Sequence, residues 1–114
     1  EAVTMYLPVE AIRSLLAAVR SRSTAGSVIA LTYRSSGERP FPAPIMRAVE
    51  AALRVMGEPL RAAPSPAATA ALLEEAGFAV TSDTSSIDWA PRFGASGPLA
   101  RVFRAERLVV ARTR

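Results

Sequence analysis

The chain has 114 residues, which is enough for one domain with a single modest core. Half of the residues are hydrophobic, which argues against an intrinsically disordered chain. The sequence contains no Cys, His or Lys, so it excludes a disulfide scaffold, a zinc site, a Cys–His or Ser–His nucleophile and a Schiff-base lysine. The groups that could take part in catalysis are therefore carboxylates, hydroxyls, arginines and the backbone. This limited set argues against a self-contained enzyme.

The formal net charge is +4, and every basic residue is an arginine. The excess of arginines over acidic residues is greatest between Arg92 and Arg114, where Glu106 is the only acidic residue. The few aromatic residues do not alternate with arginines as a base-stacking surface requires. We therefore interpret the excess as a solvated face and do not expect nucleic acid as a partner.

No segment reaches the roughly 20 apolar residues of a membrane span, and the first residues lack the basic flank and apolar run of a signal peptide. We therefore expect no membrane partner. A chain without Cys is compatible with a reducing compartment, and we expect a cytoplasmic location.

The first half of the chain predicts two strands around one helix. The short apolar segment Ala2–Leu7 predicts a buried strand. Pro8 suits the start of a helix, and apolar residues at helical spacing predict an amphipathic helix that continues to about Arg22. The uninterrupted apolar run Val28–Tyr33 predicts a strand that is covered on both faces.

The second half predicts two further helices, each followed by a glycine. One extends from about Ala43 to Met56 and ends at Gly57. The other begins after the N-cap Ser65, covers Pro66–Ala76 and ends at Gly77.

Strands are predicted at Phe78–Ser82 and Arg107–Arg112, and the segment Ser85–Phe93 is compatible with one helical turn around Trp89. The resulting alternation predicts a single α/β domain over residues 1–114, with about four strands, which run parallel, and flanking helices. No G-x-G follows a predicted strand, so the sequence lacks the glycine-rich loop that usually binds a nucleotide in such a sheet. The pattern is that of half a doubly wound sheet.

Four segments resemble one enzyme family in the correct order. Glu1–Pro8 is similar to an E-x-x-x-x-Y-L-P segment, and Gly57–Arg61 is similar to a G-E-P segment. Leu72–Phe78 resembles an L-L-x-x-A-G-F corner, and Glu106–Arg112 resembles a closing E-R-x-x-V-A-R strand. The family is that of the S-adenosylmethionine-dependent leucine carboxyl methyltransferases, which includes polyketide O-methyltransferases.

This resemblance implies that the chain is the C-terminal half of a class I, Rossmann-like methyltransferase domain. Its strands would be the fourth to seventh, and the last would lie antiparallel between two others. The G-x-G loop and the ribose-binding acidic residue would lie upstream, so we expect S-adenosylmethionine as cofactor, no metal, and an inactive fragment. The expected partners are the N-terminal half of the same domain, or a second copy that pairs through the edge of the Ala2–Leu7 strand.

The resemblance also implies that Glu1 binds the cofactor, although a frayed terminal residue is the alternative. Tyr6 and Tyr33 lie at the carboxyl ends of predicted strands, where α/β ligands bind, so each phenol could orient a substrate oxygen or simply pack. Arg61 could pair with a substrate carboxylate or be a solvated loop residue. Trp89 and Phe93 are interpreted as core or cap residues and not as a binding site.

Methyl transfer is an in-line displacement, for which positioning supplies much of the rate. A carboxylate acceptor needs no general base, whereas a hydroxyl acceptor would require one. We therefore predict an O-methyltransferase for a small molecule, with either acceptor open. The alternatives are a non-catalytic α/β module that binds a protein through an apolar edge, and an arginine-rich nucleic-acid binder.

Overall fold

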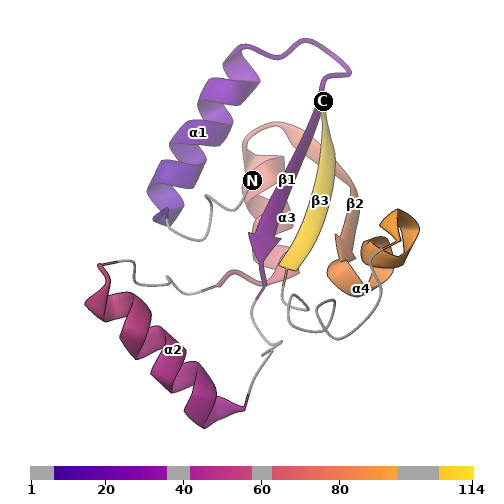
Figure 1. Cartoon of the computed structure of the whole chain (residues 1–114). Helices are drawn as coiled ribbons and strands as arrows, with labels where there is room; N and C mark the ends of the chain where they lie inside the picture. Colours follow the sequence, from indigo (N-terminus) through magenta and orange to yellow (C-terminus); the bar gives the residue numbers. More distant parts are fainter. Residues whose placement is uncertain (1–6, 36–41, 58–62, 95–105) are drawn as a thin grey trace.

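The computed structural model describes residues 7–35, 42–57, 63–94 and 106–114. Its elements in chain order are α1 (Val9–Ser21), β1 (Val28–Arg34), α2 (Ala43–Val55), α3 (Pro66–Glu75), β2 (Phe78–Ser85), α4 (Ser86–Trp89), the 3-10 turn η2 (Ala90–Phe93) and β3 (Glu106–Thr113) (Figure 1). The three predicted long helices and the last three predicted strands are confirmed. The helical turn that the sequence allowed around Trp89 is confirmed as α4.

Local signals account for the ends of the helices. The Ser65 hydroxyl accepts a hydrogen bond from the Ala68 amide at 3.1 Å, which caps α3, and Pro66 fills the first helical position. Gly77 follows α3 with φ of 88°, a left-handed conformation that favours glycine. Gly57 follows α2 in the same left-handed conformation, with φ of 78°.

The three strands form one sheet in the order β1-β3-β2, and β3 is antiparallel to both neighbours. The last strand therefore lies antiparallel between two others, as the family resemblance implies. β1 and β2 run parallel to each other, as the alternation of strands and helices predicts. Because β3 lies between them, no two hydrogen-bonded neighbours among the described strands are parallel. The predicted strand Ala2–Leu7 lies outside the described residues except for Leu7, which is in a bend, so four strands are not confirmed.

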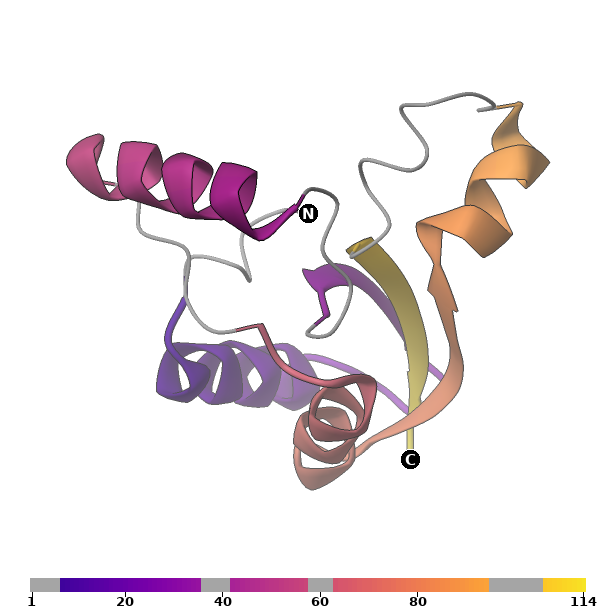
Figure 2. The same cartoon turned by 90° about the horizontal axis from the view of Figure 1, so that it is seen from below.

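The core lies between one face of the sheet and the helices α1 and α3, which Figure 2 shows on the same side of the strands. The residues of this buried cluster are Leu16, Tyr33, Leu73, Phe78, Val109 and Ala111. The register pairs Tyr33 with Arg107, Leu31 with Val109 and Ile29 with Ala111, so these side chains share the covered face. Helix and sheet thus form two layers around a small core.

The opposite face, called the open face below, has no helix over it within the part of the chain that is described (Figures 1 and 2). Its residues are Val28, Ala30, Thr32, Arg34, Ala79, Ser82, Thr84, Glu106, Leu108, Val110 and Arg112. Val28 is 56% exposed, so the prediction that Val28–Tyr33 is covered on both faces is wrong for the described residues. The physical reason is that α1 and α3 both pack on the other face of the sheet.

Candidate functional site

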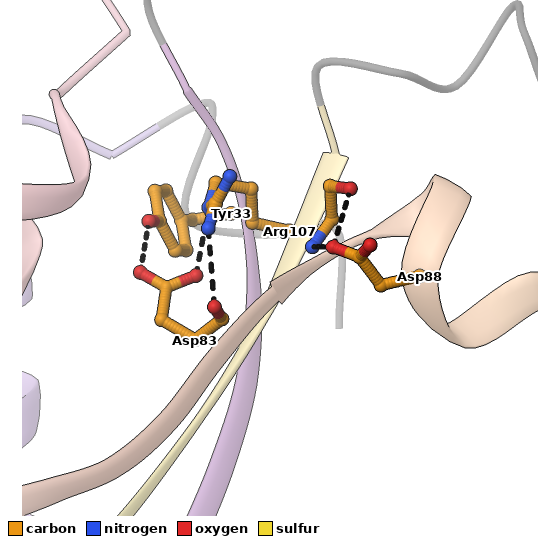
Figure 3. Close-up of polar contacts among 5 residues, drawn as sticks. Tyr33, Asp83, Asp88 and Arg107 are labelled. Carbon is orange, nitrogen blue, oxygen red and sulfur yellow. Dashed lines mark hydrogen bonds and ion pairs between the residues drawn. The ribbon is translucent and has the colours of Figure 1, made fainter.

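Three polar side chains from three strands meet at one edge of the sheet (Figure 3). Tyr33 lies near the carboxyl end of β1 and Asp83 near the carboxyl end of β2. Arg107 lies near the beginning of β3, which runs in the opposite direction and so brings its first residues to the same edge. We call these residues the Asp83 cluster.

The Asp83 carboxylate holds the cluster together. The Tyr33 hydroxyl donates to Asp83 Oδ2 at 2.5 Å, and Arg107 Nε donates to Asp83 Oδ1 at 2.7 Å. Arg107 Nη2 also donates to the Asp83 carbonyl oxygen at 3.1 Å. The Asp83 and Arg107 side chains are only 16% and 22% exposed, and Tyr33 is buried. The buried polar groups therefore satisfy one another through charge-assisted hydrogen bonds.

This environment fixes the protonation state of the phenol. Burial, followed by the hydrogen bond to Asp83, raises the pKa of Tyr33 to about 12. The hydrogen bond to Asp83 also raises the pKa of Arg107. Near neutral pH Tyr33 is thus a hydrogen-bond donor and cannot act as a general base.

A second carboxylate at this edge shapes the chain where β2 ends. The amide and hydroxyl of Ser85 both donate to Asp88 Oδ2, at 3.1 and 2.9 Å, as Figure 3 shows. These hydrogen bonds lower the pKa of Asp88. The arrangement resembles half of a capping box, in which a carboxylate in the first turn holds the residue before the helix. Asp88 therefore anchors the start of α4.

The predicted site residues are only partly within the described residues. Glu1, Tyr6 and Arg61 lie outside them. Tyr33 is described, and its hydroxyl is engaged by Asp83. The sequence interpretation did not identify Asp83 or Arg107. Their only signal was their position: Asp83 directly follows the predicted strand Phe78–Ser82, and Arg107 begins the predicted strand Arg107–Arg112.

The described residues do not form a site that fits S-adenosylmethionine. The aspartates at the sheet edge are occupied by partners within the chain, Asp83 by Tyr33 and Arg107 and Asp88 by Ser85. Over the same residues there is no group of three or more His, Cys, Asp or Glu that could hold a metal ion. None of the helices described is long and apolar enough to cross a membrane.

Comparison with known proteins gives a likeness to solved structures but none to a family model or a curated protein. The solved structure of the pyocyanin biosynthetic protein PhzM is similar, with a TM-score of 0.59 and 19% sequence identity. The match covers 99% of this chain and 28% of PhzM, so the chain spans less than a third of that protein. At this identity the likeness shows a shared fold and no more.

Proposed function

We propose that the chain is the C-terminal part of the catalytic domain of an S-adenosylmethionine-dependent O-methyltransferase that acts on a small molecule. The observation that carries the proposal is the shared fold with PhzM, an S-adenosylmethionine-dependent O-methyltransferase, over 99% of this chain. The position of β3, antiparallel between β1 and β2, agrees with the arrangement that the resemblance to leucine carboxyl methyltransferases implies.

In this proposal the ligands bind at the carboxyl edge of the sheet, as is general for open α/β sheets. Glu1 binds the cofactor, and Tyr6 and Arg61 bind the substrate. Tyr33 lies at the same edge and, being protonated, can contribute only as a hydrogen-bond donor, in exchange for its bond to Asp83. The hydrogen bonds of the Asp83 cluster connect all three strands there.

S-adenosylmethionine, when bound, supplies the methyl group that is transferred. Since the described residues do not form a site that fits it, we propose that most of the cofactor site lies in residues outside this chain. The partner would be the N-terminal half of the same domain, or a second copy through the edge of the Ala2–Leu7 strand. The acceptor is either a carboxylate, which needs no general base, or a hydroxyl, for which Tyr33 cannot serve as the base near neutral pH.

Calorimetric titration with S-adenosylmethionine tests the proposal. The complete translated polypeptide that contains this sequence is compared with residues 1–114 alone. We expect the complete polypeptide to bind and residues 1–114 to give no measurable heat of binding. A complete polypeptide that shows neither binding nor methyl transfer to any carboxylate or hydroxyl acceptor tested would refute the proposal.

A further inference from the structure

Arg107 carries hydrogen-bond donors that the Asp83 cluster does not use. A guanidinium has five N–H groups in one fixed plane. Asp83 accepts from two of them, since Nε donates to Oδ1 at 2.7 Å and Nη2 donates to the carbonyl oxygen at 3.1 Å. Both bonds leave the guanidinium on the side that faces Asp83, as Figure 3 shows. Among the described residues, no acceptor lies at hydrogen-bonding geometry to the other three N–H groups.

These unused donors include a second fork, which we call the free fork of Arg107. It consists of Nη1 and the remaining N–H of Nη2, which point in parallel along the guanidinium plane. Two parallel N–H groups of this kind match the two oxygens of a carboxylate. Because Asp83 already holds the other side of the guanidinium, a ligand at the free fork does not have to order the side chain.

The surroundings of Arg107 favour strong hydrogen bonds at the free fork. The Arg107 side chain is 22% exposed, whereas that of Arg114 is 61% exposed. The hydrogen bond to Asp83 and, to a smaller extent, the neighbouring Tyr33 raise the pKa of Arg107. Arg107 is therefore charged and partly shielded from water, which strengthens the bonds that its free donors can form.

The other charged groups at this edge do not fill the free fork. Arg34 and Glu106 form the next pair of the register and therefore lie on the open face of the sheet. The charge of Arg107 contributes to the lowered pKa of Asp88, after the two hydrogen bonds from Ser85. Within the part of the chain that is described, however, Asp88 makes no ion pair with Arg107, and its Oδ2 accepts from Ser85.

We infer that the free fork of Arg107 binds a carboxylate of the substrate and thereby selects small molecules that carry one. The inference rests on the proposed function, which places the ligands at the carboxyl edge of the sheet, and it adds the chemical class of the substrate. It concerns the group that anchors the substrate and not the group that accepts the methyl. Asp83 is a positioning residue in this arrangement, because it fixes the guanidinium from the other side.

Binding of benzoate tests the inference, with the uncharged isostere benzamide as the control ligand. Both dissociation constants are measured by ligand-observed NMR on the complete translated polypeptide that contains this sequence, without S-adenosylmethionine. We expect benzoate to bind about tenfold more tightly than benzamide, since hydrogen bonds between charged groups are roughly twice as strong as neutral ones.

Two variants assign this preference to the free fork. Arg107→Lys keeps a positive charge beside Asp83 but has no planar fork, so the preference for benzoate should fall to about twofold or less. Arg92→Lys, which changes an exposed arginine of η2, should leave the preference unchanged. A preference that survives in Arg107→Lys would overturn the inference.

A measurement on the unaltered polypeptide applies even where Arg107→Lys does not fold. Phenylglyoxal modifies arginine side chains, and peptide mapping reports the rates at Arg107 and Arg92 separately. Benzoate at ten times its dissociation constant should slow the modification of Arg107 about tenfold by mass action and leave that of Arg92 unchanged. Equal rates at Arg107 with and without benzoate would contradict binding at the free fork.

The outcome is separable from that of the proposed function. Benzoate binding that depends on Arg107, in a complete polypeptide that does not bind S-adenosylmethionine, would retain the carboxylate site and reject the methyltransferase. Cofactor binding in a polypeptide whose preference for benzoate does not depend on Arg107 would retain the methyltransferase and reject the carboxylate site.

Discussion

Removal of the Asp83 carboxylate should destabilise the fold far more than removal of an exposed carboxylate. In Asp83→Ala the Tyr33 hydroxyl and Arg107 Nε each lose an acceptor, while the bond from Arg107 to the backbone carbonyl of residue 83 can remain. The positive charge of Arg107, whose side chain is 22% exposed, is then left largely buried without its counter-ion.

The magnitude follows from the two lost interactions. A hydrogen bond to a charged group contributes ~1.5–3 kcal/mol, and such contributions within one network are not additive. Because both side chains keep some contact with water, we expect a loss of ~2–4 kcal/mol in the free energy of unfolding. That is a large share of the ~5–15 kcal/mol by which a domain is stable.

Urea unfolding, followed by circular dichroism at neutral pH, measures the effect. The matched control is Glu74→Ala, which removes an exposed carboxylate 3.9 Å from Arg114. The control should change the free energy of unfolding by less than ~1 kcal/mol, as is usual for exposed ion pairs. Equal losses in the two variants would refute the argument that the Asp83 cluster ties the three strands together.

Two further predictions concern the pH dependence of Tyr33 and the cap of α3. Tyr6→Phe leaves Tyr33 as the only tyrosine, and its ultraviolet absorbance should report ionisation at about pH 12, whereas an exposed tyrosine titrates near 10. The pKa of Tyr33 is higher in the folded than in the unfolded state, so its contribution to stability is fully present below pH 10 and is lost between pH 10 and about 12. A Tyr33 that titrates at pH 10 in the folded protein would contradict this. Ser65→Ala should lower the free energy of unfolding by ~1 kcal/mol, since the Ala68 amide loses its acceptor, and Ser65→Asp, which restores one, should recover most of the loss. Thermal unfolding of the two variants checks the cap, and equal losses in both would show that the hydrogen bond is not the cause.

The helices and their ends could be predicted because their causes are local. The apolar spacing of α1 and α2, the Ser65-Pro66 start of α3 and the glycines that end two helices all act within a few residues. The ends of the strands were less accurate. The segment predicted at Phe78–Ser82 continues to Ser85, since pairing with β3 extends it beyond its apolar residues.

The tertiary structure alone decided how distant residues meet. Asp83 is 50 residues from Tyr33 and 24 from Arg107, and only the registers of β1 and β2 with β3 place the three side chains on one face. Without that register, Tyr33 was indistinguishable from a ligand-binding phenol at a strand end. Its burial beside a carboxylate is what gives it a raised pKa.

The sequence by itself determined that the run Val28–Tyr33 is apolar on both faces except at Thr32, because side chains alternate along a strand. The tertiary structure decided that α1 and α3 cover one of these faces within the described residues and leave Val28 and Ala30 exposed on the other. The physical reason is that composition sets which surfaces gain free energy from burial, whereas chain connectivity and strand register set which of them the available helices can reach.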